Sequence, residues 1–175
     1  MPASGPASAV IVRVPVPPSI ERLRRRWDRA ASVGVPAHVT LLFPFLAPGD
    51  LAPNARRELA SIAAVNVPFE VTFASVGRFP NVVYLMPAPS GPFTRLTEAV
   101  FARFPGFPPY EGAFAEVIPH LTVAESTSAP HDEIAREAAA LLPIRHRIMT
   151  LEVLVEGAEG RWHGHWRLPL GRVRR

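Results

Sequence analysis

The sequence predicts an α+β fold in two pseudo-symmetric lobes, each a small antiparallel sheet flanked by helices, with a groove between them. Both halves of the 175-residue chain read strand, helix, strand, helix, strand. The middle strand of each half carries the motif His-x-Thr, at 38–40 and at 120–122. We expect a single domain over residues 1–175, with lobe one at about 8–80, lobe two at about 81–170, and strands free to swap between lobes.

Composition limits the possible chemistry of the chain. It is 48% hydrophobic, which is enough for a substantial core, and its net charge is +4. All 19 basic side chains are arginines, whose planar fork suits phosphate oxygens. Cysteine is absent, which excludes disulfides, thiolate zinc sites and cysteine nucleophiles.

The N-terminal part of the chain does not resemble a targeting segment. Met1–Ser8 has no positively charged region, and the apolar run at 9–16 is interrupted by Arg13 and Pro15. No other apolar run approaches the roughly 20 residues that a membrane span requires. We therefore expect a cytoplasmic protein with no membrane partner.

Apolar periodicity and turn residues define the expected elements of the first half. Ser19 is expected to cap the first helix, and strict alternation marks the last strand. The elements are a buried strand at 9–16, a helix at 19–31, the first motif strand at 38–43, a helix at 53–64 and a strand at 69–73.

The second half repeats this order with a longer loop before its motif. Its expected elements are a strand at 82–86, a helix at 92–104, a Pro/Gly-rich loop at 105–112, the second motif strand at 117–124, a helix at 130–142, a long strand at 145–156 and a final strand at 161–170.

The first predicted helix carries a cluster of arginines. A nucleic-acid-binding patch is one interpretation. A solvated helix face is favoured, because apolar residues recur at helical spacing on the opposite side. The arginines are Arg22, Arg24, Arg25 and Arg26, and the apolar residues are Ile20, Leu23, Trp27 and Ala30.

The two His-x-Thr motifs suggest acid/base chemistry. Side chains at i and i+2 of a strand share a face, so each motif pairs an imidazole with a hydroxyl donor. Two copies in equivalent positions could form a catalytic pair. The alternative is that each histidine is a core residue hydrogen-bonded to its neighbouring threonine.

The motif segments resemble those of a known family. HVTLLFPF at 38–45 and PHLTVA at 119–124 are similar to the two signature segments of the two-histidine (2H) phosphoesterases, which include 2′-5′ RNA ligases and cyclic nucleotide phosphodiesterases. The likeness in length and element order covers nearly the whole chain, and its specificity lies in these two segments. Phe43 departs from the pattern, since many members carry glycine there, and would narrow the groove without touching the chemistry.

The resemblance implies a bilobal fold and metal-independent attack on a 2′,3′-cyclic phosphate or a 2′-5′ phosphodiester, with no cofactor. Opening a cyclic phosphate to a 2′-phosphate needs a base for the nucleophile and an acid for the leaving oxygen. Histidine can fill either role, so His38 and His120 are the expected pair. Thr40 and Thr122 are expected to donate to phosphate oxygens. The expected partner is RNA or a nucleotide with a cyclic phosphate, and we expect a monomer.

Several functional alternatives remain open at this point. The chain could ligate 2′-5′ RNA, or hydrolyse another small cyclic phosphodiester. It could be an RNA-binding module without turnover, or a structural protein with a disused groove. Which histidine acts as base cannot be read from the sequence.

Further side chains are candidates for holding the substrate. Four aromatic residues could stack on a nucleobase, although most aromatics are expected in the core: Phe45, Phe79, Tyr84 and Trp162. Arg78 could contact a phosphate or be a surface arginine. His163 and His165 would share a strand face as a possible metal pair. Because no third ligand lies nearby in sequence, a solvated strand is the favoured interpretation for them.

Overall fold

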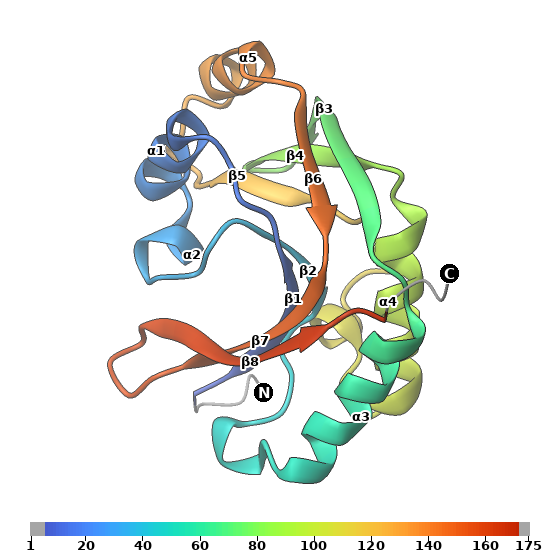
Figure 1. Cartoon of the computed structure of the whole chain (residues 1–175). Coiled ribbons are helices and arrows are strands. Elements are labelled where there is room, and N and C mark those ends of the chain that lie inside the picture. The colour runs from blue at the N-terminus through green and yellow to red at the C-terminus, as the bar shows by residue number, and fades with distance from the viewer. Residues whose placement is uncertain (1–5, 172–175) are drawn as a thin grey trace.

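The computed structural model describes residues 6–171, so part of Met1–Ser8 lies outside the described residues. Within these residues there are eight strands and five α-helices, and Figure 1 shows their arrangement. The strands are β1 (Ser8–Arg13), β2 (His38–Leu42), β3 (Phe69–Phe79), β4 (Val82–Ala88), β5 (Leu121–Glu125), β6 (Ile144–Ile148), β7 (Thr150–Glu156) and β8 (Trp162–Pro169). The α-helices are α1 (Pro18–Trp27), α2 (Arg29–Ser32), α3 (Pro53–Val65), α4 (Gly91–Arg103) and α5 (His131–Ala140), and the 3₁₀ helices are η1 (Pro48–Asp50) and η2 (Pro109–Gly112).

The strands form two four-stranded antiparallel sheets, which confirms the predicted α+β class. The first sheet has the order β2-β1-β7-β8 and the second has the order β5-β4-β3-β6. Both motif strands are edge strands, and each pairs with the first strand of its own half. Thr40 lies opposite Ile11 in the first sheet, and Thr122 lies opposite Tyr84 in the second.

The two halves of the chain exchange elements between the sheets. β3 comes from the first half but belongs to the second sheet, whereas β7 and β8 come from the second half and complete the first sheet. Helices also pack on strands from the other half of the chain, since α1 contacts β5 and α4 contacts β2. α3 packs on β8, and α5 packs on β3, β4 and β5 (Figure 1).

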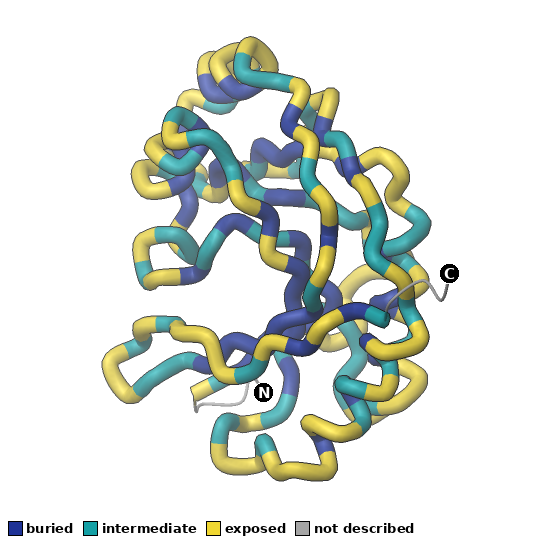
Figure 2. Tube along the Cα trace, in the orientation of Figure 1, coloured by how far each residue is buried: buried dark blue, intermediate teal, exposed yellow. Residues whose placement is uncertain are grey.

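A continuous core joins the two sheets. Strand alternation turns Val39 and Leu41 of β2 inward, together with Val123 of β5, and all three are fully buried. They belong to one cluster that also includes Val71 and Phe73 of β3. Buried stretches follow the strands through the middle of the molecule (Figure 2). The inward-facing residues of both motif strands therefore pack into the same core.

Asp28 breaks the helix that was predicted to run from 19 to 31. Its backbone is extended, with φ −114° and ψ 111°, and its Oδ1 accepts a 3.0 Å bond from the Ala30 N–H at the start of α2. The prediction of a Ser19 cap is also wrong. Pro17 occupies that position, and no side chain caps α1.

Two predicted strands have different limits. The strand predicted at 145–156 is two strands that separate at Met149 and enter different sheets. The second motif strand begins at Leu121, not at 117, so His120 immediately precedes β5.

Within residues 6–171, no helix has the length and apolar character needed to cross a membrane.

Candidate active site

The first motif orients His38 through both ring nitrogens. Nδ1 lies 2.7 Å from the carbonyl oxygen of Pro36. A carbonyl can only accept, so Nδ1 carries the proton, and Nε2 of the neutral ring is an acceptor. The Thr40 hydroxyl, 3.0 Å away, therefore donates to Nε2.

The surroundings of His38 keep its imidazole neutral. The pKa of His38 is lowered from 6.5 to about 4, and burial is the largest cause. The positive charges of Arg24, His120 and Arg13 contribute to this lowering, and the bond to Pro36 opposes it. At pH 7, His38 is thus a base with its lone pair on Nε2.

The second motif repeats the backbone anchor with different neighbours. His120 Nδ1 donates to the carbonyl oxygen of Ile118 at 2.7 Å. The ring centroid lies 5.2 Å from that of Phe79 and 5.4 Å from that of Tyr84. These two aromatic rings stack on each other at 4.2 Å, so His120 is held against an aromatic wall.

Gly77 makes room for that wall. A Cβ atom at Gly77 would lie 2.3 Å from Cζ of Tyr84. No real side chain tolerates such a contact, so any larger residue at Gly77 would displace the Tyr84 ring and the support of His120.

The two motifs lie close together in the fold. β2 and β5 contact each other, and the charge of His120 acts on His38. Arg24 reaches both segments, because its guanidinium donates to the carbonyl oxygens of Pro36 and Thr122. Arg24 is 1% exposed, so the predicted solvated position is wrong for it, although Arg25 and Arg26 are exposed.

Sequence reasoning missed Tyr110. The Tyr110 N–H donates to the Phe43 carbonyl oxygen at 2.7 Å, and its hydroxyl lies beside Thr40. Burial raises the pKa of Tyr110, so its hydroxyl keeps its proton at neutral pH. Since Thr40 donates to His38, its oxygen can accept from Tyr110. The backbone of Tyr110 and Glu111 is left-handed, with φ of 51° and 55°.

The predicted substrate-binding residues lie in different surroundings. Phe45 is 4% exposed and packs edge-on against Phe104 and Phe107, so this side chain belongs to the core and not to a binding surface. Arg78 is paired with the exposed Asp132 at 2.9 Å.

The remaining predicted residues are near motif segments. Tyr84 is buried under Phe79 and beside His120. Trp162 is half-buried, and its ring lies 6.0 Å from that of Phe43, which follows β2.

No trio of histidine, aspartate or glutamate side chains within residues 6–171 is arranged to hold a metal ion. His163 and His165 are exposed on β8, as the solvated-strand interpretation predicts.

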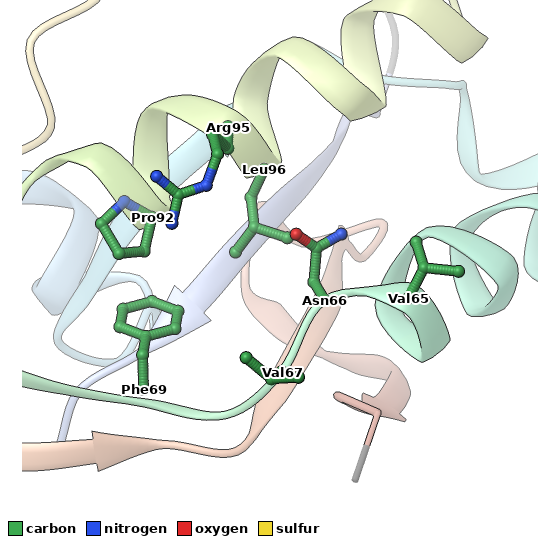
Figure 3. Close-up of a pocket in the computed structure, with 7 residues that line it drawn as sticks. All are labelled: Val65, Asn66, Val67, Phe69, Pro92, Arg95 and Leu96. Carbon is green, nitrogen blue, oxygen red and sulfur yellow. The ribbon is translucent and has the colours of Figure 1, made fainter. Parts of the chain in front are cut away.

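A pocket of about 240 Å³ lies away from both motifs (Figure 3). It is formed where α3 ends, β3 begins and α4 starts, with Phe69, Pro92 and Arg95 in its lining. None of its lining residues belongs to a motif, so it carries no part of the acid/base chemistry. The central groove itself stays a prediction.

Comparisons with known proteins agree with the motifs. Residues 12–160 match the model of the 2′-5′ RNA ligase superfamily. A protein of Bacillus thuringiensis named "Putative phosphoesterase" is 30% identical over 155 residues, covering 86% of this chain and 87% of that protein. A protein of Bacillus cytotoxicus with the same description is 35% identical, but the match covers only 64% of each.

Solved structures share the fold. TT0787 of Thermus thermophilus superimposes with a TM-score of 0.63 at 19% identity, covering 96% of this chain and all of that one. LigT of Escherichia coli, crystallised with 3′-AMP, gives a TM-score of 0.53 at 16% identity and covers 95% of this chain and 98% of its own. With paired His-x-Thr motifs on the edges of two sheets and a family match over most of its length, the chain belongs to the 2′-5′ RNA ligase superfamily of 2H phosphoesterases.

Proposed function

We propose that the chain hydrolyses 2′,3′-cyclic phosphates at the ends of RNA or on nucleotides, without a metal, and releases a 2′-phosphate. The observation that carries this proposal is the pair of matching histidine anchors. In each motif, Nδ1 is fixed to a carbonyl oxygen two residues upstream at 2.7 Å. This leaves Nε2 of each ring as the nitrogen for proton transfer.

His38 is the general base in this proposal. Its lowered pKa keeps Nε2 unprotonated at neutral pH, so it can take a proton from water as the water oxygen bonds to phosphorus. His120, entering the reaction protonated, gives its Nε2 proton to the 3′ oxygen as the bond between phosphorus and that oxygen breaks. Exchange with solvent then restores both rings.

Thr40 and Thr122 stabilise the charge on the phosphate. Their hydroxyls share a strand face with the histidines, and charge on the non-bridging oxygens is where donors help most. Thr40 exchanges its bond to His38 for one to the phosphate when the substrate enters.

Trp162 and Phe43 are the aromatic pair proposed to receive the nucleobase. They are close to each other and Phe43 directly follows the first motif strand, while Tyr84 is already covered by Phe79. Stacking of this kind tolerates any base.

The test is hydrolysis of nucleoside 2′,3′-cyclic phosphates in EDTA by the wild type, His38→Ala and His120→Ala. We expect turnover by the wild type and a loss of about 100- to 10,000-fold in either variant. His163→Ala, which removes an exposed imidazole on β8, is the matched control.

Each of three results would contradict the proposed function. Equal activity in all variants would remove the histidines from the chemistry. Loss of activity in EDTA would require a metal mechanism. Tight RNA binding by the His38→Ala/His120→Ala variant, with no wild-type turnover of cyclic phosphates, would indicate an RNA-binding module.

A further inference from the structure

Arg24 is the largest fully buried side chain in the described part of the protein. It lies on α1 at 1% exposure, while the neighbouring Arg25 is 74% exposed. Burying a guanidinium is costly unless its donors are satisfied, so its partners show what the burial achieves.

Two of its partners are carboxylates that neutralise its charge. Nη2 lies 2.9 Å from Oδ2 of Asp28, which is itself buried, and Nη1 lies 3.1 Å from Oε2 of Glu21. Helical spacing places both acids beside Arg24, three residues before it and four residues after it.

The other partners are backbone carbonyls of the two motif segments. Nη2 is 3.3 Å from the Val35 oxygen and 3.4 Å from the Pro36 oxygen, and Nε is 3.2 Å from the Thr122 oxygen. The Pro36 oxygen is also the acceptor that fixes Nδ1 of His38. One rigid, planar group thus contacts the anchor of the first histidine and the backbone of the second threonine.

We propose that Arg24 is a positioning residue that sets the distance between the two His-x-Thr motifs. As a catalytic statement, this rests on the proposed function. Both motifs lie on edge strands of different sheets, and no strand pairing joins β2 to β5 among the described residues. The guanidinium supplies a polar link between the segments where sheet hydrogen bonding does not.

The charge of Arg24 has a second effect on the same site. It disfavours a proton on His38, as do the charges of Arg13 on β1 and of His120 before β5. Of the two arginines, Arg24 has the larger effect on the pKa of His38.

Lysine at position 24 separates the two effects. An ammonium keeps the charge but lacks the fork, so it cannot bond to the Pro36 and Thr122 oxygens with the same fixed geometry. Glutamine removes the charge and keeps some hydrogen-bonding capacity. Arg25→Lys and Arg25→Gln are matched controls on the exposed face of the same helix.

The experiment measures turnover of a nucleoside 2′,3′-cyclic phosphate and follows the His38 ring by NMR titration in each variant. We expect Arg24→Lys to lower kcat by about 100-fold, with little change in KM, because a small misplacement of catalytic groups is enough for such a loss. In Arg24→Gln, the pKa of His38 should rise toward its ordinary value. The Arg25 variants should match the wild type in both measurements.

Two results would overturn the inference. One is equal kcat in Arg24→Lys and Arg25→Lys, and the other is an unmoved His38 titration in Arg24→Gln. The titration needs no substrate. A wild type that does not hydrolyse cyclic phosphates would therefore refute the proposed function alone, while a shifted His38 titration would still support the role of Arg24 at the motifs.

Discussion

The two His-x-Thr motifs share a backbone arrangement but differ in their surroundings. Both histidines are anchored through Nδ1 at 2.7 Å to the residue two positions upstream. His38 is additionally bonded to Thr40, whereas no hydrogen bond joins His120 to Thr122 within residues 6–171. Polar and charged groups surround the first motif, and aromatic rings surround the second.

This difference shows how a pseudo-symmetric scaffold can support asymmetric chemistry. Identical anchors expose the same ring nitrogen twice, and the neighbours of His38 lower the pKa of that ring. The charges of Arg24 and Arg13 help to keep the His38 ring unprotonated at neutral pH. In the proposed mechanism, the role of His38 as the base therefore depends on residues outside its motif.

The largest expected effect is on the pH dependence of stability. Unfolded His38 binds a proton below about pH 6.5, but folded His38 does so only below about pH 4. Between these values the unfolded state holds more protons, so the free energy of unfolding falls as the pH is lowered. Over the difference of about 2.5 between the two pKa values, the contribution to the free energy of unfolding reaches about 3.5 kcal/mol, at about 1.4 kcal/mol per pH unit.

His38→Gln should flatten this slope in urea titrations between pH 4 and 6.5. Glutamine carries no titrating group and can still donate to the Pro36 oxygen. An identical slope in the variant and the wild type would show that His38 is not held neutral by its surroundings.

The next largest effect is expected from Gly77→Ala, which disturbs the packing that supports the second motif. Gly77→Ala places a methyl group on the Tyr84 ring, and overpacking of this kind costs about 1–3 kcal/mol of unfolding free energy. Hydrolysis should fall as well, because Tyr84 supports His120. Gly49→Ala is the control, since a Cβ there meets no atom within 4 Å. Equal unfolding free energies for the two variants would contradict the packing argument.

The smallest effect is expected from Tyr110→Phe at the first motif. The variant keeps the ring and removes the hydroxyl that can donate to Thr40, and one such hydrogen bond contributes about 1 kcal/mol. We expect kcat/KM to fall about two- to tenfold, with the backbone bond to Phe43 intact. An unchanged kcat/KM would mean that Thr40 is positioned without Tyr110.

Local patterns predicted the parts of the site that depend on alternation. Val39 and Leu41 are buried while His38 and Thr40 are only half-buried, as a period of two residues requires. The break at Met149 is not marked by alternation. Residues 151–155 are all buried after it, so no period of two shows where one strand ends and the next begins.

The supporting residues are harder to predict. Arg24 follows Ile20 by four residues, so it lies on the apolar side of α1, with an acidic residue before it and another after it. Its charge alone nevertheless predicts a solvent-exposed position. Tyr110 has no local signal at all. Its loop lacks periodicity, and its contact with Thr40 spans 70 residues of chain, so only the folded structure reveals it.

The exchange of elements between the sheets also bears on how such a molecule can be divided or engineered. A cut between residues 80 and 81 would give two fragments that each carry one motif, yet neither fragment would contain a complete sheet, since β3 would be separated from β4 and β7 from β1. Neither half of the sequence therefore encodes a complete sheet. A fragment of one-half length could complete these sheets only by pairing with strands of the other half.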